Sequence, residues 1–346
     1  MIAILADDLS GAAELAGIAA SRGFTAEVQT VFDPTSTADI IAVDTDTRLK
    51  SEAEAARIVG EVTRHILASH PAWIYKKTDS VLRGHIRAEI EAILDAAGLD
   101  DCVFSPANPS KDRLIRKGRY EIGGVPLDET VFARDPDYPR TSSLVRELLG
   151  ASDRIQTPDA IDPDDLMIDL PPTTLAAGAA DFFAAQLARK ESSLGFSPSP
   201  SSTLGLKPKP LSTLLLSGSL AAWDLDRAAQ MEQRGFLVKT IADDLSPSIW
   251  QTTSKLMLAI GRPPSSDPAT LTETLIDKAL PLLSGRNDLR IGLEGGATAI
   301  AFIRRLGWTR FEVIPEGHTG VGTLRPPGEP VLYVKPGSYP WPEGCL

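Results

Sequence analysis

Cysteine and histidine are scarce in this chain of 346 residues. The two cysteines, Cys102 and Cys345, lie far apart and have no cysteine or histidine beside them at metal-binding spacing. This spacing indicates neither a disulfide framework nor a zinc site, and it fits a protein of the reducing cytoplasm. The histidines also lack ligand spacing, so we expect each of them to be structural or exposed: His65, His70, His85 and His318.

The chain also has fewer basic than acidic residues and no long apolar run. Lysine and arginine total 35 against 46 aspartates and glutamates, which gives a net charge of −11. A nucleic-acid partner is not expected, because phosphate backbones require a basic surface, whereas a few local cations suffice for a small anionic substrate. No apolar run approaches the roughly 18 residues that span a bilayer, and the first residues lack the basic start of a signal peptide. We therefore expect no membrane partner and a cytoplasmic protein.

The opening residues contain the first candidate site. Residues 2–6 form an uninterrupted apolar run, which is typical of a strand buried on both faces. Asp7 and Asp8 end that run, and the alanines and leucines that follow Gly11 predict a packed helix. In an open α/β sheet, ligands bind at this end of a strand. A helix cap would explain one of the two acids, but not both.

Short strands alternate with helices through the first half of the chain. Further strands are expected at 25–31, 39–43, 73–75 and 102–104, and helices at 51–68 and 85–97. This alternation predicts a parallel, doubly wound sheet. Polar clusters follow four of the strands, at residues 7–8, 44–48, 77–83 and 105–108. Because the carboxyl ends of parallel strands share one edge, we expect these clusters to line one cleft.

This cleft would contain acids and cations together. Lys77 and Arg83 suit an anionic substrate, since arginine can bind a carboxylate through two parallel hydrogen bonds. Asp7, Asp8 or Asp79 could accept protons from hydroxyl groups. The alternative is that Lys77, Asp79 and Arg83 form a solvated surface network.

The segment 111–137 is long and irregular, and its glycines Gly118, Gly123 and Gly124 suggest a turn-rich hairpin. Such a flap could exclude water from a bound substrate, or it could be an ordinary surface excursion. A helix is expected at 141–149, and late strands near Ile155 and at 167–168. Residues 173–190 are helical in composition, with Gly178 inside the expected helix.

Residues 192–210 are rich in serine, proline and glycine, a composition that cannot form a core. We take them as a linker between a first domain, 1–191, and a second domain, 211–346. The strand–helix pattern restarts after the linker, with strands at 211–216, 236–240, 290–293, 311–314 and 331–334, and helices at 223–234, 271–283 and 299–306. The expected fold is therefore α/β, with two doubly wound domains, mostly parallel sheets and an interdomain cleft.

Small residues, rather than charges, follow the strands of the second domain. The turn 217–219 follows one strand, the glycines 295–296 follow another, and Lys335 follows the last. Glycines and free backbone N–H groups allow a phosphate to approach closely, so this edge suits a nucleotide. Plain turns would explain the same residues, and no Walker A loop occurs.

Several of these segments resemble motifs of the four-carbon acid sugar kinases, a family that includes the threonate, erythronate and 3-oxo-tetronate kinases. In the first domain the similar segments are 6–12 (ADDLSGA), 77–84 (KTDSVLRG), 106–109 (PANP), 118–130 (GRYEIGGVPLDET) and 133–136 (ARDP). In the second domain they are 217–219 (SGS), 295–298 (GGAT), 320–322 (GVG) and 335–337 (KPG). The resemblance implies a sugar acid bound by the first domain and ATP bound by the second.

The chain departs from the family pattern at a few positions. Ser10 replaces the usual threonine and keeps the hydroxyl group, while Ala297 stands where the family commonly has glutamate after the paired glycines. The chain is also shorter than usual between the domains and around residues 262–270, and its tail lacks the common Phe-Gly ending.

The activity implied by the resemblance is ATP-dependent phosphorylation of the terminal hydroxyl of a four-carbon sugar acid, a tetronate or 3-oxo-tetronate. Asp7, Asp8, Lys77 and Arg83 are the expected catalytic residues, and they are joined in substrate binding by Arg48, Asp79 and Asn108. The expected nucleotide-binding residues are Ser217, Ser219, Gly295, Gly296, Ala297, Thr298, Gly320, Lys335 and Gly337.

Mg²⁺ is expected to bridge the ATP phosphates without a dedicated set of protein ligands, and a homodimer is compatible with the resemblance. Two other functions remain open. A non-catalytic or regulatory homologue would bind the sugar acid without transfer, as Ala297 and the short second domain suggest. A metal-dependent hydrolase would use Asp7, Asp8, Asp44 and Asp46, although the chain has few histidines to complete such a centre.

Overall fold

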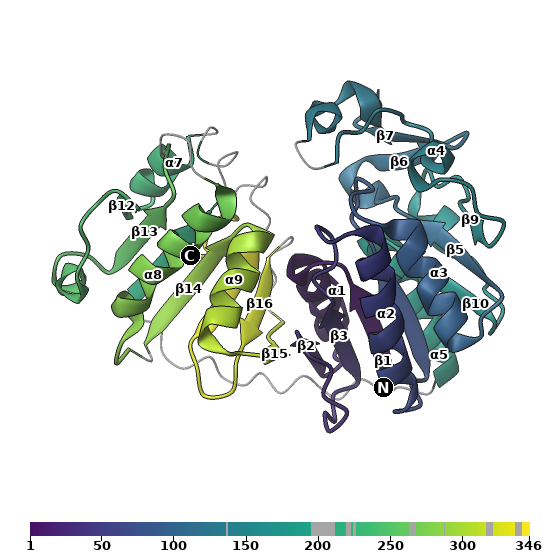
Figure 1. Cartoon of the computed structure of the whole chain (residues 1–346), viewed down its shortest axis with the longest axis horizontal. Coiled ribbons are helices and arrows are strands. Elements are labelled where there is room, and N and C mark those ends of the chain that lie inside the picture. Colours follow the sequence, from purple (N-terminus) through teal and green to yellow (C-terminus); the bar gives the residue numbers. More distant parts are fainter. Residues whose placement is uncertain are drawn as a thin grey trace. The chain divides into compact units, whose positions relative to one another are not determined.

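The chain forms two compact units, Met1–Pro200 (unit 1) and Ser201–Leu346 (unit 2) (Figure 1). The computed structural model describes residues 1–135, 138–194, 212–218, 223, 226–262, 267–286, 288–315, 321–335 and 341–346. The boundary between the units falls within the segment 192–210 that the sequence analysis assigns to a linker. Most of that linker lies outside the described residues.

Unit 1 is built on a parallel sheet with the strand order β2-β3-β1-β4-β10-β5-β9. The central strand β1 is buried along its whole length, as its uninterrupted apolar sequence predicts. The strands are β1 (Ile2–Ala6), β2 (Ala26–Gln29), β3 (Ile40–Asp44), β4 (Trp73–Lys77), β5 (Asp101–Ser105), β9 (Ile155–Gln156) and β10 (Thr174–Gly178).

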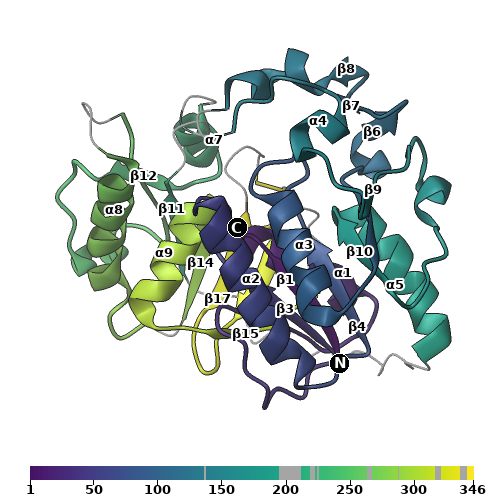
Figure 2. The same ribbon diagram turned by 45° about the vertical axis from the view of Figure 1, so that its right-hand side comes forward.

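Helices cover both faces of this sheet. On one face, α1 packs on β2 and β3 and against α5, while α2 and α3 pack together on the other face (Figure 2). The neighbouring strands β1 and β4 are therefore followed by helices on opposite faces, which makes their carboxyl ends the topological switch point where α/β sheets bind ligands. The helices are α1 (Leu9–Ser21), α2 (Glu52–Leu67), α3 (Ile86–Ala97), α4 (Val145–Leu149) and α5 (Ala180–Leu194).

The expected hairpin segment is a small antiparallel sheet of β6 (Arg113–Arg116), β7 (Arg119–Ile122) and β8 (Val125–Pro126). Gly118 and the pair Gly123 and Gly124 adopt positive φ angles of 72°, 60° and 75° at its turns. Glycine tolerates this left-handed conformation at low cost, which explains why the glycines mark the turns. Short 3₁₀ turns follow at Leu127–Glu129 and Val131–Arg134.

Unit 2 contains a mostly parallel sheet with the order β12-β13-β11-β14-β17-β16-β15. The first five strands in this order are parallel, and β16 runs antiparallel to both β17 and β15. The strands are β11 (Ser212–Ser217), β12 (Leu237–Thr240), β13 (Lys255–Ala259), β14 (Leu289–Glu294), β15 (Arg310–Val313), β16 (Gly322–Arg325) and β17 (Val331–Lys335). The α/β class with mostly parallel sheets is thus confirmed.

The faces of this second sheet are covered by different parts of the chain. One face carries α8 (Pro268–Leu283) and α9 (Gly296–Leu306), which pack against each other. The other carries α7 (Arg227–Gln233) and the C-terminal residues, whose Met231 and Trp341 join a buried cluster with Leu215 of β11. Because β11 leads to α7 and its neighbour β14 leads to α9, the switch point of unit 2 lies between their carboxyl ends.

Two expectations about the end of unit 1 are wrong. Residues 173–190 are not one helix: β10 ends at Gly178, and α5 begins at Ala180. Gly178 has a φ of 152°, and a Cβ there would lie 2.0 Å from the carbonyl oxygen of Ser105, so the glycine is required by close packing between strands. Met167 and Ile168 form no strand, because a 3₁₀ turn at Pro163–Leu166 precedes them and Met167 is exposed.

Candidate functional site

Arg48 holds both acids of the opening motif. Its Nε and Nη2 atoms lie 2.7 and 3.0 Å from the two carboxylate oxygens of Asp7, and Nη1 lies 2.9 Å from Oδ2 of Asp8. Asp7 and Asp8 follow β1 and Arg48 follows the adjacent strand β3, so the parallel pairing of these strands brings the three side chains together. The same arginine also lies 3.7 Å from Asp79, which follows β4 on the other side of β1.

Asp8 is both a helix cap and a member of this ion cluster. Its Oδ1 accepts a hydrogen bond from the Gly11 amide at the start of α1, and its Oδ2 accepts from the Ser10 hydroxyl. Burial alone would raise the pKa of Asp8, but the charges of Arg48 and Lys77 outweigh it and lower the pKa below its usual value. Asp8 is therefore an ionised carboxylate at neutral pH.

Asp79 and Arg83 form a second ion pair on the β4–α3 loop. Arg83 donates to the two carboxylate oxygens of Asp79 at 3.0 and 2.8 Å, and the Val81 and Arg83 amides donate to the same carboxylate. Burial opposes ionisation of Asp79, but Arg48 and Arg83 more than compensate and hold its pKa far below the usual range. The loop therefore presents a fixed carboxylate, and Arg83 remains about a third exposed.

Lys77 is almost fully buried at the end of β4 and faces the start of α1. Its ammonium lies 3.0 Å from the Thr78 carbonyl oxygen and 3.5 Å from Glu14, which in turn contacts Lys111 at 2.8 Å. A Cβ on Gly11 would lie 3.2 Å from the Lys77 ammonium and 2.7 Å from Asp8. A glycine at position 11 thus allows the lysine and the helix cap to approach each other.

Asp44 lies at the carboxyl end of its strand, as expected, and Asn108 follows β5. Asp44, the last residue of β3, is buried, and its Oδ2 has no hydrogen-bond partner among the described residues. Burial raises the pKa of Asp44 well above its usual value, and the nearby Asp46, Asp8 and Asp7 raise it further. The Asn108 side chain contacts α5, because its Oδ1 accepts from the Asp181 amide at 3.0 Å.

Contacts from the hairpin segment fix the β4–α3 loop from the outside. The Arg113 guanidinium donates to the Ser80 hydroxyl at 2.5 Å, and the Tyr120 hydroxyl donates to the Ser80 carbonyl oxygen. Asp135 lies 3.6 Å from Arg83. The excursion therefore packs on the loop that carries Asp79 and Arg83, rather than lying free on the surface.

The switch point of unit 2 is organised around Glu294, a residue that the sequence analysis missed. Glu294 is fully buried at the end of β14, where it lies 2.9 Å from Arg227 and 2.9 Å from Lys335 and accepts from the Ser217 hydroxyl at 2.7 Å. Burial lowers the pKa of Lys335, although Glu294 partly offsets this effect. Two cationic side chains thus share one carboxylate at this edge.

The amino end of α9 lies beside this group and has no side-chain cap. Gly295 precedes the helix with a φ of 105°, and Gly296 and Ala297 form its first turn. A Cβ on Gly218 would lie 1.9 Å from the Thr298 hydroxyl, so only glycine fits at position 218. A small-residue turn, an uncapped helix end and two cations form a suitable cradle for a phosphate group.

Three expected nucleotide-binding residues, Ser219, Gly320 and Gly337, lie outside the described residues. Within the described part of the chain, no three His, Cys, Asp or Glu side chains are grouped to hold a metal ion. The acids proposed for a hydrolase therefore form no metal centre there. In the same part of the chain, no helix is long and apolar enough to cross a membrane.

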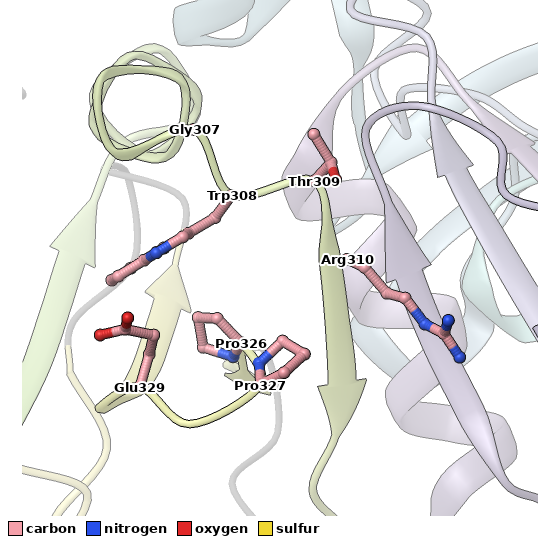
Figure 3. A pocket seen from close by; sticks show the side chains of 7 residues that line it. All are labelled: Gly307, Trp308, Thr309, Arg310, Pro326, Pro327 and Glu329. Atoms are coloured by element: carbon pink, nitrogen blue, oxygen red, sulfur yellow. The ribbon is translucent and has the colours of Figure 1, made fainter.

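A surface pocket of about 230 Å³ lies elsewhere in unit 2, at the opposite edge of the sheet. It follows the end of α9 and precedes β17, with Trp308 and Glu329 extending into the same space while Arg310 points away (Figure 3). It involves none of the expected site residues. Its lining residues are Gly307, Trp308, Thr309, Arg310, Pro326, Pro327 and Glu329.

The chain is similar in sequence to curated sugar-acid kinases. It is 34% identical over 159 residues to the D-erythronate kinase of Heliobacterium modesticaldum, an alignment that covers 44% of this chain and 36% of the relative. It is 38% identical over 160 residues to the D-threonate kinase of Bordetella bronchiseptica, covering 44% of this chain and 39% of the relative. The alignments therefore span well under half the length of these relatives.

Solved structures match over nearly the whole chain. A Haemophilus influenzae protein matches with a TM-score of 0.73 at 19% identity, covering 98% of this chain and 97% of the other, which shows the fold alone. A Bordetella bronchiseptica protein, solved with bound citrate as a domain-swapped dimer, matches with a TM-score of 0.52 at 26% identity, covering 98% and 95%.

A family model described as the sugar-binding N-terminal domain matches residues 2–190. This match includes β1, β3 and β4 and every charged residue of the cluster around Arg48. It covers more than half of the chain, and the curated relatives are named erythronate and threonate kinases. The chain therefore belongs to this sugar-binding family, the four-carbon acid sugar kinases.

Proposed function

We propose that this protein is an ATP-dependent kinase that phosphorylates the terminal hydroxyl of a four-carbon sugar acid, a tetronate or 3-oxo-tetronate. The observation that carries the proposal is the charged cluster at the switch point of unit 1, where Arg48 contacts Asp7, Asp8 and Asp79 at 3.7 Å or less. The names of the curated relatives support the same class of substrate.

Unit 1 would bind the sugar acid through the charged side chains at its switch point. Arg83 is partly exposed beside Asp79, so its guanidinium can bind a substrate carboxylate, while the buried Lys77 would add positive charge to the site from below. The ionised Asp8 and Asp79 can accept hydrogen bonds from sugar hydroxyls. Fixed carboxylates and cations on three neighbouring strands would orient the substrate before any chemistry takes place.

The transfer would form a bond between the sugar hydroxyl oxygen and the γ-phosphorus, and would break the bond between that phosphorus and the oxygen bridging to the β-phosphate. Asp8 would orient the hydroxyl and receive its proton. Its lowered pKa makes it a weak base, which suits phosphoryl transfer because bond breaking to the leaving group runs ahead of proton removal in a loose transition state.

Unit 2 would hold the nucleotide, which supplies the transferred phosphoryl group. The Gly218 turn and the amino end of α9 would contact its phosphates, and Lys335 and Arg227 would balance their charge. The described residues form no metal-binding group. Mg²⁺ would therefore be held mainly by the nucleotide's own phosphates.

Binding measurements separate the kinase from a sugar-acid-binding homologue that has lost transfer. Calorimetry with threonate, erythronate and ATP, each added alone to the full chain, should show binding of one tetronate and of ATP. Lys335→Met should weaken ATP binding because the phosphates lose a cation, while tetronate binding stays unchanged and shows that unit 1 is folded. Tetronate binding without any ATP binding would favour the non-catalytic homologue instead.

A homodimer is part of the proposal, supported by the Bordetella bronchiseptica structure solved as a domain-swapped dimer. That structure also contains citrate, which is a small carboxylate-bearing molecule like the proposed substrate. Light scattering of the purified chain would show whether it forms a dimer in solution.

A further inference from the structure

Tyr138 lies just after the hairpin segment 111–137, and it contacts the loop that carries Arg48. The Tyr138 hydroxyl donates a hydrogen bond to the carbonyl oxygen of Arg48. Arg140 supports the tyrosine from two sides: its guanidinium carbon lies 5.7 Å from the centre of the Tyr138 ring, and its Nε donates to the Tyr138 carbonyl oxygen at 2.7 Å. Arg140 also donates to the Leu82 carbonyl oxygen at 2.6 Å, which anchors it to the Asp79 loop.

His85 holds the same loop two residues further along. Its Nε2 lies 2.5 Å from the carbonyl oxygen of Lys50, and because a carbonyl oxygen can only accept, Nε2 carries the hydrogen. The His85 and Tyr138 rings pack edge to face, with their centroids 6.1 Å apart. Tyr138, His85 and Arg140 together form what we call the Tyr138 clamp.

The start of the loop is anchored by the buried Thr45 and Thr47, and the Lys50 amide donates to the Thr47 carbonyl oxygen, but the exposed Leu49 directly follows Arg48. Asp46 has a positive φ of 46°, Leu49 is 68% exposed, and the Thr47 and Arg48 amides share the single carbonyl oxygen of Asp7. The Arg48 side chain nevertheless has to place three nitrogen atoms within 3.0 Å of two carboxylates. The Tyr138 hydroxyl bonds to the backbone of Arg48, the residue whose side chain makes these three contacts.

We propose that Tyr138 is a positioning residue, which fixes the backbone of Arg48 so that its guanidinium holds Asp7 and Asp8 in place for the sugar acid. The part of this inference that concerns substrate rests on the proposed function, whereas the hold on the loop does not. Tyr138 acts through Arg48 and need not touch the substrate itself.

Tyr138→Phe removes only the hydroxyl, so hydrogen exchange of the full chain can test the hold directly. We expect exchange of the amides 47–50 to increase about fivefold, in line with the loss of one hydrogen bond. The matched control is Tyr120→Phe, because Tyr120 lies in the preceding hairpin segment and its hydroxyl donates to the Ser80 and Pro106 carbonyl oxygens instead. This control should leave amides 47–50 at wild-type rates.

Steady-state kinetics with the preferred tetronate provides the second readout. Tyr138→Phe should raise KM for the sugar acid about fivefold while KM for ATP stays constant, because only the sugar-acid side is loosened. Wild-type exchange at 47–50 in Tyr138→Phe, or an equal increase in Tyr120→Phe, would overturn the positioning role. If the wild-type chain phosphorylates no tetronate, the proposed function fails, and the exchange result still decides whether Tyr138 holds the loop.

Discussion

Arg48 is the residue on which the arrangement of unit 1 depends most. It contacts Asp7 with two nitrogens and Asp8 with a third, so one guanidinium holds both carboxylates of the adjacent acids in place. Both interpretations of the opening motif therefore apply to Asp8, which caps α1 and also belongs to the ion cluster. Asp7 has no capping role and contacts Arg48 from the buried side.

Asp44 makes the stability of the protein depend on pH. Its pKa is raised in the folded state, so the native chain keeps a proton that the unfolded chain releases above about pH 4. The wild-type free energy of unfolding should therefore decrease as the pH rises from about 4 toward the folded pKa. Asp44→Asn cannot ionise, so it should be more stable than wild type by about 1–3 kcal/mol at pH 7, with no gain at pH 3.5.

Urea unfolding of both proteins at several pH values would measure this difference. The control is Asp169→Asn, because Asp169 is 92% exposed and its contact with Arg189 should contribute little at any pH. An Asp44→Asn variant that is less stable than wild type at pH 7 would contradict this prediction.

At the scale of elements, β4 and α3 are joined by a buried ion pair. Lys76 of β4 and Glu89 of α3 lie 2.6 Å apart, and each side chain is only 1% exposed. We expect Glu89→Gln to destabilise the protein by about 3–5 kcal/mol, because it leaves the Lys76 ammonium buried without its partner. The double variant Lys76→Met, Glu89→Leu should recover most of this loss, since it leaves no buried charge. Urea denaturation would measure both, and equal loss in the single and double variants would contradict this explanation.

The same ion pair shows why part of the fold was predictable and part was not. The apolar spacing predicts the ends of β1, β3 and α2 to within one or two residues of where the structure has them. Ser51 precedes α2 and caps it, as a serine at that position commonly does. The sequence analysis ended β4 at residue 75, whereas the strand continues through Lys77. Two consecutive lysines suggest that a buried strand has ended. Lys76 can be buried inside the protein only because it pairs with Glu89, which is distant in the sequence.

Two strands of unit 2 were missed for a related reason. The residues of β13 include Leu256, Met257 and Leu258, which favour a helix as much as a strand, and their strand conformation follows from pairing with β11 and β12. Strand β16 (Gly322–Arg325) begins with a glycine, and the sequence analysis predicts no strand there. In both cases the strand forms because it pairs with strands that are distant in the sequence, and a local sequence pattern gives no information about such pairing.

The candidate site was predictable where it depends on topology alone. Polar residues that follow parallel strands must share one edge, and this placed Asp8, Arg48 and Asp79 together without knowledge of any contact. Glu294 was not predicted, because a glutamate before two glycines looks like part of a turn. Its role depends on Arg227 and Lys335, which reach it from other elements.

At the scale of the whole molecule, the two units repeat one architecture with different chemistry. Each has a switch point between neighbouring parallel strands, β1 and β4 in unit 1 and β11 and β14 in unit 2. Fixed carboxylates and cations occupy the first, whereas small residues, a free helix end and cations around one glutamate occupy the second. This difference is what a polyhydroxy acid and a nucleotide would each require.

Release of ADP from ATP, measured with the full chain and a panel of threonate, erythronate and 3-oxo-tetronates, tests the kinase proposal most directly. We predict that one of these acids supports ADP formation, and that the same molar amount of this acid is phosphorylated on its terminal hydroxyl. Asp8→Asn should reduce kcat by at least about 100-fold, because the hydroxyl loses its acceptor. ADP release that needs no tetronate, no release with any of them, or unchanged turnover in Asp8→Asn would contradict the proposal.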